Sequence, residues 1–236
     1  MTPLFAAYER LYVINLASRA DRRAEMAEQL QRVGLSFASP QVRLFEAVRP
    51  ADAGPFPSVG AHGCFMSHLG VLRDARSAGL QRIVIFEDDL NFAADFATLA
   101  LPALAAAERP ECAIFYGGHE LAQPLAAGAG AVEIAADRPI QTAHFVAFHG
   151  AAIGTAVDYL EAMLRRAPGD PAGGPMHVDG AYSWLRRAHP ALRTWAALPV
   201  LGHQRSSRTD IHALRWFDRL PLVRDAVARL RRVRNR

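Results

Sequence analysis

The amino-acid sequence predicts an α/β fold with a mostly parallel central sheet flanked by helices. Short apolar runs typical of strands alternate along the chain with segments whose apolar residues recur at helical spacing. The run at residues 82–86 (RIVIF) is apolar at successive positions, as in a central parallel strand that is covered on both faces. At 236 residues the chain is long enough for one such domain with its own core.

The first predicted strand lies at residues 11–16, where apolar and β-branched side chains dominate. The polar stretch that follows has apolar residues at helical spacing and stops at Gly34, which predicts a helix. A second strand is expected at residues 42–48. Residues 50–60 are rich in proline and glycine, which predicts a loop.

A second helix is predicted at residues 61–78, closed by Gly79 and followed by the strand at 82–86. An alanine-rich stretch at residues 92–107 predicts the third helix, and residues 113–116 the next strand. The remaining order is loop, strand, helix, loop, helix and strand, at residues 126–131, 143–148, 155–166, 168–175, 178–188 and 192–198.

Positive charge is concentrated at the end of the chain. Residues 215–236 hold eight arginines against Asp218 and Asp225, so this tail carries +6 and residues 1–214 carry −2. Its apolar side chains fall on one helical face, which predicts a basic amphipathic helix after a single catalytic domain of residues 1–214. Such a helix suits an anionic membrane surface, although packing against the domain is the alternative. Equal binding of anionic vesicles by a version that ends at Leu214 would contradict membrane attachment.

Composition also indicates which cellular compartment and which classes of partner to expect. Two cysteines, Cys64 and Cys112, are too few for a disulfide framework, which favours a reducing compartment. The N-terminus lacks the pattern of a signal peptide, so we expect a cytoplasmic protein, with the tail on the inner face of the cytoplasmic membrane. The body lacks the basic patch with stacking aromatic residues that nucleic-acid binding requires, so no nucleic acid is expected as partner.

Three acidic residues, Glu87, Asp88 and Asp89, follow directly after the apolar strand at residues 82–86. Ligands of open α/β sheets bind beyond the carboxyl ends of the strands, and carboxylates there can hold Mg²⁺ or Mn²⁺ on substrate phosphates. Alternation along an extended segment predicts Glu87 and Asp89 on one side and Asp88 on the other. The alternative is a solvated turn that leads to a helix capped by Asn91.

At this point the chain resembles glycosyltransferase family 25, the lipopolysaccharide (lipooligosaccharide) sugar transferases. The resemblance rests on residues 12–23 (YVINLASRADRR), 60–68 (GAHGCFMSH) and 85–89 (IFEDD), in the family's order and spacing. It departs from the family at Ala61, where an acidic residue is more common. The resemblance implies a GT-A-like nucleotide-diphosphosugar transferase fold, a UDP-sugar donor, commonly UDP-galactose, and a lipooligosaccharide or related glycan acceptor. It also implies inverting transfer assisted by a divalent metal.

The resemblance implies roles for residues around the donor. Asn15 and Arg19 are placed at the nucleotide base and ribose, and Glu87 is a further donor-binding candidate. Ser67 and His68 are placed near the donor sugar or diphosphate. Arg22 could contact phosphate, because a guanidinium matches phosphate geometry; a solvated helix face is the alternative for this arginine.

Asp89 is the first metal candidate and Asp88 the second. His203 and Gln204 could supply a later metal or phosphate ligand, and a surface turn is the alternative for these two residues. Asp88 and Asp179 are the candidate catalytic residues. Asp179 follows a glycine-rich loop and would remove the proton from the acceptor hydroxyl, as the looser resemblance of residues 177–184 suggests. Its alternative role is the N-cap of the helix that begins there.

Cys64 and His68 lie four residues apart and share a helical face. A zinc site would need two more ligands, so a buried thiol beside a satisfied histidine is the commoner explanation. Two other functions remain open. A nucleotidyltransferase acting on sugar phosphates would use similar carboxylates, although the chain lacks a glycine-rich loop after its first strand. A non-catalytic glycan-binding relative would retain the fold without turnover.

Overall fold

The computed structural model describes residues 4–125 and 128–205. Within them the strands are β1 (Arg10–Asn15), β2 (Val42–Glu46), β3 (Arg82–Glu87), β4 (Leu90–Phe92), β5 (Ile114–Glu120), β6 (Gly130–Ile134), β7 (Gln141–His149), β8 (Thr194–Leu198) and β9 (Gly202–Gln204). The helices are α1 (Ala20–Arg32), α2 (Val59–Ser77), α3 (Phe96–Ala107), α4 (Ala151–Leu164) and α5 (Val178–Ala188).

The main sheet has seven strands in the order β2-β1-β3-β7-β5-β8-β6. β1 runs parallel to β2 and β3, and β5 runs parallel to β8. β7 is antiparallel to both of its neighbours, and β6 is antiparallel to β8. Five of the seven strands therefore share one direction. The predicted α/β fold with a mostly parallel sheet flanked by helices is confirmed.

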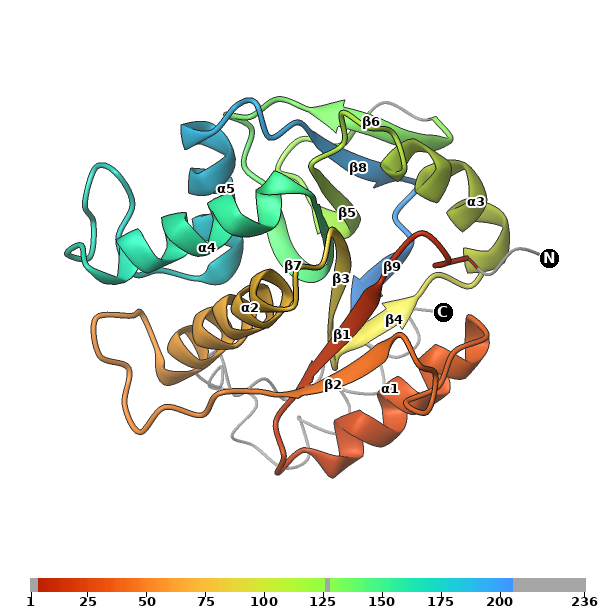
Figure 1. Ribbon diagram of the computed structural model, residues 1–236, viewed down its shortest axis with the longest axis horizontal. Coiled ribbons are helices and arrows are strands. Elements are labelled where there is room, and N and C mark those ends of the chain that lie inside the picture. The colour runs from red at the N-terminus through yellow and green to blue at the C-terminus, as the bar shows by residue number, and fades with distance from the viewer. Residues whose placement is uncertain (1–3, 126–127, 206–236) are drawn as a thin grey trace, which may run out of the picture. The chain divides into compact units, whose positions relative to one another are not determined.

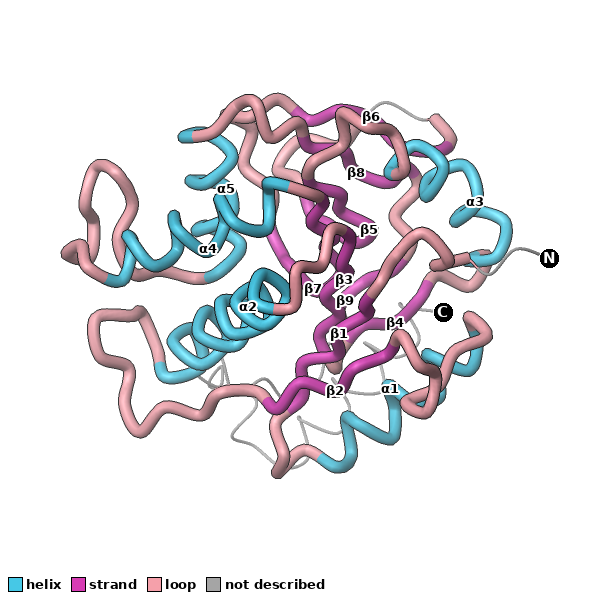
Figure 2. Tube along the Cα trace, in the orientation of Figure 1, coloured by secondary structure: helices cyan, strands magenta, loops and turns pink. Residues whose placement is uncertain are grey.

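Helices cover both faces of this sheet, with α2, α4 and α5 on one face and α1 and α3 on the other (Figure 1). Figure 2 shows the strands as a continuous layer between these two groups of helices. Alternate side chains of β3 enter the two cores: Ile83 and Ile85 pack under α2, while Val84 and Phe86 pack toward α1 and α3. All four are fully buried, which explains the continuous apolar run in the sequence.

Three predicted elements differ from the structure. The helix expected from residue 92 begins at Phe96, because Leu90–Phe92 instead forms β4, which pairs with β9. The helix expected from residue 155 begins at Ala151, directly after Gly150, whose φ of 54° suits glycine. β6 begins within the stretch predicted as a loop, since Val132 and its neighbours pair with β8. The predicted domain boundary at residue 214 and the helix at residues 215–236 lie outside the described residues.

His149 gives the fold a specific dependence on pH. Its Nδ1 donates to the carbonyl oxygen of Cys112 at 2.8 Å, and burial lowers the pKa of His149 from 6.5 to about 4. Between these values the unfolded chain binds a proton that the folded protein does not bind, so stability falls as the pH drops. The asparagine of His149→Asn can keep the hydrogen bond but does not titrate. We expect this variant to lose about 2 kcal/mol less stability than the wild type between pH 7 and pH 5.

The measurement is the free energy of unfolding in urea at both pH values. His189→Asn is the matched control, because it makes the same replacement at a histidine that is only partly buried, at the end of α5. Comparison of the two variants isolates the effect of burial. Equal pH dependence of the wild type and the His149→Asn variant would contradict the assignment.

Candidate active site

The candidate site lies where β1 and β3 end side by side. The two strands are parallel, and Ile14 of β1 lies opposite Glu87 of β3. Asn15 at the end of β1 consequently reaches the turn after β3, where its Nδ2 donates to Asp88 Oδ2 at 2.7 Å. The pairing of neighbouring parallel strands thus brings together residues that are 73 positions apart.

Asp88 and Asp89 form a turn between β3 and β4, so the predicted alternation of side chains ends at Glu87. Both aspartates face Arg22, whose NH1 lies 2.9 Å from Asp88 Oδ1 and 3.6 Å from Asp89 Oδ2. Glu87 points instead toward α2. The expectation that Glu87 and Asp89 share a side was therefore wrong, because a turn does not preserve the alternation of a strand.

Arg22 is buried, so the alternative of a solvated helix face is wrong for this residue. Its guanidinium offsets the charge of two buried carboxylates, which would otherwise repel each other. Arg19 precedes the first residue of α1 and forms an ion pair with Asp21 at 2.8 Å. The turn formed by Asp88 and Asp89 is called the acidic rim below. Of the two predicted arginines, Arg22 lies inside this rim and Arg19 lies beside it, at the start of α1.

Among the described residues, the carboxylate of Asp89 accepts fewer hydrogen bonds than that of Asp88. Its Oδ2 accepts a hydrogen bond from Gln204 Nε2 at 3.1 Å, while its Oδ1 is buried with no hydrogen-bond partner among the described residues. Burial and the nearby charge of Glu87 raise the pKa of Asp89 to about 7, although Arg22 opposes this shift. A divalent cation on the unpartnered oxygen would satisfy it and favour the ionised carboxylate. The rim therefore fits a hard cation such as Mn²⁺ or Mg²⁺.

The strand β9 supplies further polar groups to this rim. Gln204 contacts Asp89, and Arg205 donates from its NH2 to the carbonyl oxygen of Asp88 at 2.6 Å. His203 lies opposite Asn91, which is part of β4 and not a helix cap. Burial and then the charge of Arg32 lower the pKa of His203. In the described chain the neighbour of His203, and not His203 itself, makes the contact with Asp89.

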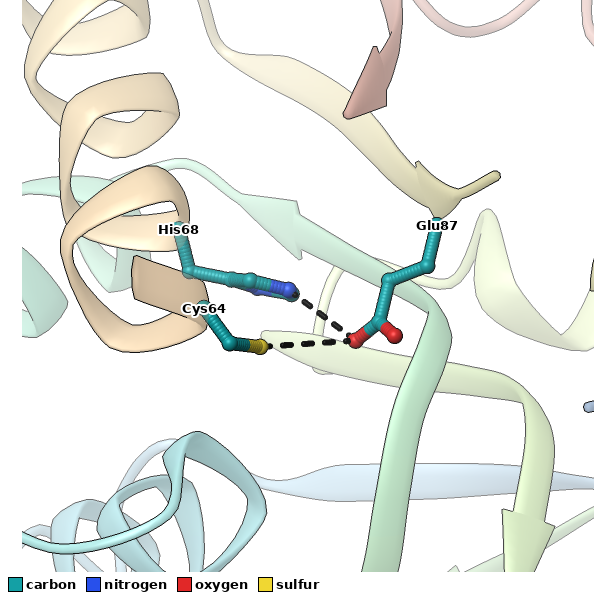
Figure 3. Close-up of side chains that lie close together, drawn as sticks. All are labelled: Cys64, His68 and Glu87. Atoms are coloured by element: carbon teal, nitrogen blue, oxygen red, sulfur yellow. Dashed lines mark hydrogen bonds and ion pairs between the residues drawn. The ribbon is translucent and has the colours of Figure 1, made fainter. Parts of the chain in front are cut away.

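Glu87 faces two side chains of α2 (Figure 3). Its Oε1 lies 3.2 Å from His68 Nε2 and 3.9 Å from Cys64 Sγ. The other ring nitrogen of His68 lies 3.0 Å from the hydroxyl of Tyr182. Burial alone would raise the pKa of Glu87, but the hydrogen bond and charge of His68 lower it overall.

Ser67, predicted near the donor, is fully buried and has two internal hydrogen bonds. Its hydroxyl donates to the carbonyl oxygen of Gly63 at 2.6 Å and accepts from the backbone amide of Val48 at 2.8 Å. The structure therefore places Ser67 between α2 and the chain segment after β2. His68, one residue further along α2, is the member of this pair that reaches the rim through Glu87.

Asp179 lies in the first turn of α5, one residue after its start, so it is not the N-cap; His177 holds that position. Its carboxylate accepts hydrogen bonds from the backbone amides of Thr142, at 3.1 Å, and Gly180, at 2.8 Å. Thr142 has a φ of 66°, an uncommon conformation for threonine. These amides hold the partly exposed carboxylate of Asp179 in one orientation.

Sequence reasoning did not single out Tyr182 and Arg205, which both contact predicted site residues. Tyr182 is one helical turn after Asp179, a spacing that places both on one side of a helix. That spacing was a usable signal for Tyr182. Arg205 comes to the rim only through the pairing of β9 with β4, and its position in the sequence gives no comparable signal.

The described fold is similar to that of a solved glycosyltransferase involved in the glycosylation of the major capsid of PBCV-1. The TM-score is 0.50, and the similarity covers 84% of this chain and 92% of the other. At 11% sequence identity this likeness concerns the fold alone. The domain thus has the GT-A-like architecture that the sequence resemblance implied.

Residues 8–116 match the sequence model of a family described as Glycosyltransferase family 25 (LPS biosynthesis protein). The match includes β1, α2 and the acidic turn after β3. The resemblance to family 25 inferred from the sequence is confirmed.

Among curated proteins, the chain is 36% identical over 93 residues to the lacto-N-neotetraose biosynthesis glycosyltransferase LgtB of Neisseria meningitidis serogroup B. This similarity covers 34% of the chain and 32% of LgtB, so it spans about a third of the relative. The chain is also 28% identical over 110 residues to the inactive glycosyltransferase 25 family member 3 of Homo sapiens, covering 40% of the chain and 18% of that protein.

None of the helices within the described residues combines the length and the apolar composition needed to cross a membrane.

Proposed function

We propose that the protein is a glycosyltransferase that moves a sugar, galactose in the first instance, from a UDP-sugar to a glycan acceptor. The acceptor class is a lipopolysaccharide, a lipooligosaccharide or a related glycan. The family match and the name of the LgtB relative support the reaction class and the acceptor class. The GT-A-like fold supports a nucleotide-sugar donor.

One observation carries the proposal: at the carboxyl end of a central strand, the buried Oδ1 of Asp89 has no hydrogen-bond partner within residues 4–125 and 128–205. A lone carboxylate oxygen in that position is unfavourable unless a cation or a donor group binds it. Asp89, with Asp88 beside it, would hold the divalent metal, and His203 remains a further candidate ligand. When bound, such a metal supplies positive charge to the departing diphosphate.

In this proposal the other side chains around the rim bind different parts of the donor. Asn15 and Arg19 bind the nucleoside, Arg22 faces the phosphates beside Asp88, and Glu87 with His68 borders the donor sugar. Their places at the ends of β1 and β3 and on the helices next to them support this arrangement. Ser67 supports the same face of α2 through its internal hydrogen bonds.

Asp179 acts as the general base in this proposal. It takes the proton of the acceptor hydroxyl while that oxygen forms a bond to the anomeric carbon of the sugar. The bond from the anomeric carbon to the diphosphate oxygen breaks, UDP leaves, and the configuration inverts. The amides of Thr142 and Gly180 hold the carboxylate in one orientation during this step.

The test is incubation of the full chain with UDP-galactose, a lipooligosaccharide acceptor and Mn²⁺, followed by analysis of the products. We expect UDP and a galactosylated acceptor, and no pyrophosphate. Omission of the metal or addition of EDTA should stop the transfer. Pyrophosphate release from a sugar phosphate and UTP would instead identify a nucleotidyltransferase and overturn the proposal.

A non-catalytic glycan-binding protein is the second candidate, because relatives in Homo sapiens and Bos taurus that are 27–28% identical to the chain are named inactive or probable inactive. Binding of a glycan without turnover of any UDP-sugar in the same assay would favour it. Membrane attachment through residues 215–236 remains a prediction, since these residues lie outside the described part of the chain.

A further inference from the structure

Three side chains of different chemistry converge on one point between α2 and β3 (Figure 3). They are Cys64 and His68, one helical turn apart on α2, and Glu87 at the end of β3. Each offers one ligand atom, and these sulfur, nitrogen and oxygen atoms all lie within 4.8 Å of one another. Among the described residues this is the one group of three or more potential ligands that is so closely spaced.

The separations match those around a tetrahedral zinc ion. Zinc bonds to sulfur, nitrogen and oxygen ligands predict a nitrogen-to-oxygen separation of about 3.4 Å and a sulfur-to-oxygen separation of about 3.6 Å. The observed separations from Glu87 Oε1 are 3.2 Å to His68 Nε2 and 3.9 Å to Cys64 Sγ. The third separation, between Cys64 Sγ and the ligating nitrogen of His68, is at most 4.8 Å. A cation that replaces the protons between these atoms would draw the three ligands together around it.

A hydrogen bond with Tyr182 holds His68 in an orientation that suits metal binding. His68 is fully buried, and its Nδ1 lies 3.0 Å from the hydroxyl of Tyr182, itself buried on α5. Metal-bound histidines commonly use the second ring nitrogen in such a hydrogen bond, which fixes the ring and its tautomer. Cys64 and Glu87 retain partial exposure, so an ion and a water ligand can reach the fourth position from solvent.

We propose that Cys64, His68 and Glu87 bind Zn²⁺, or a divalent ion of similar affinity for thiolate, at a site separate from the hard-cation site of Asp89. The thiol of Cys64 releases its proton to solvent on binding. The proton between His68 Nε2 and Glu87 is likewise displaced to solvent or to Nδ1, so the ring ligates through Nε2 in its neutral form, with a proton on Nδ1 facing the oxygen of Tyr182. One water completes a four-coordinate site with three protein ligands.

The ligand chemistry separates this site from the rim at Asp88 and Asp89. Sulfur and imidazole ligands select zinc-like ions, whereas Mg²⁺ and Mn²⁺ prefer carboxylate oxygens. Both can bind without competing for an atom, because Glu87 contacts α2 and Asp89 contacts β9. His68 and Glu87 are also the pair placed beside the donor sugar in the proposed function, so metal binding is tested by itself, apart from sugar transfer.

Co²⁺ is the probe for the test, because it binds at zinc sites and a thiolate ligand gives it a characteristic absorption band. The full chain, reduced and kept free of oxygen, is titrated with CoCl₂ and followed in the near-ultraviolet and visible ranges. We expect a sulfur-to-cobalt charge-transfer band and the visible bands of tetrahedral Co²⁺ to saturate at one ion per chain. Addition of ZnCl₂ should remove both.

Four variants make the result specific. Cys64→Ser should lose the charge-transfer band, and His68→Gln, which keeps the thiol, should bind Co²⁺ at least tenfold more weakly. Cys112→Ser is the matched control, because Cys112 is the other free cysteine and lies outside this group. Asp89→Asn should keep the band, which separates this site from the rim. Absence of the band in the wild type, or its loss in Cys112→Ser, overturns the proposal whatever the transfer assay gives.

Discussion

Replacement of Asp89 by asparagine is expected to reduce kcat/KM for sugar transfer by at least about 100-fold, the scale on which loss of one electrostatic group in an active site acts. The amide oxygen of asparagine can still accept from Gln204, but its NH₂ group would occupy the position of the unpartnered Oδ1. A cation is repelled by that group, so the charge that stabilises the departing diphosphate is lost. The thermal stabilisation by Mn²⁺ should disappear with it.

The fold of the Asp89→Asn variant should be intact, because the substitution is isosteric and removes a buried charge beside Glu87. Circular dichroism and the unfolding midpoint without metal provide this check. Asp95→Asn is the matched control, since Asp95 is exposed just before α3 and should leave transfer unchanged. Full activity in the Asp89→Asn variant would remove Asp89 from the metal site.

Replacement of Arg22 by methionine is expected to lower the free energy of unfolding by about 3–5 kcal/mol, the cost typical of breaking a buried ion pair by removing one partner. Methionine fills much of the space of the arginine stem but leaves Asp88 and Asp89 without their counter-charge. Urea denaturation at neutral pH measures the loss. Mn²⁺ should restore more stability to this variant than to the wild type, because the cation supplies the missing positive charge near Asp89.

Arg23→Met is the matched control for this experiment. Arg23 is the next residue of α1, is only partly buried, and makes one long hydrogen bond of 3.4 Å to Ala17. Its replacement should change the free energy of unfolding by less than about 0.5 kcal/mol. Equal losses in the two variants would show that Arg22 contributes through helix propensity or packing rather than through the carboxylates.

The sequence was informative where local chemistry decides the structure. The apolar run at residues 82–86 predicted a central strand, and its side chains are divided between two cores. The acidic triplet was placed correctly at the end of that strand, since strand and turn are adjacent in the chain. β4 and β9 were missed because each has three residues, and their pairing joins segments more than 100 positions apart.

Side-chain direction at the site was less predictable. Glu87 faces α2 and the aspartates face Arg22, because the chain turns after β3. Helical spacing alone did not distinguish a buried Arg22 from a solvated one, since burial of a guanidinium requires acceptor groups from other segments, here the carboxylates of Asp88 and Asp89. Both His203 and Gln204 were candidate ligands, and the contact of Gln204 rather than His203 with Asp89 likewise depends on which face of β9 meets the rim.

The sequence by itself determined the α/β class, the order of most elements, the resemblance to glycosyltransferase family 25 and the position of the acidic rim. These follow from residues that are near one another in the chain. Only the tertiary structure decided the antiparallel directions of β7 and β6, the ion pair of Arg22 with Asp88, and the convergence of Cys64, His68 and Glu87. The physical reason is that each of these depends on contacts between distant segments, and their energy exists only once the sheet has assembled.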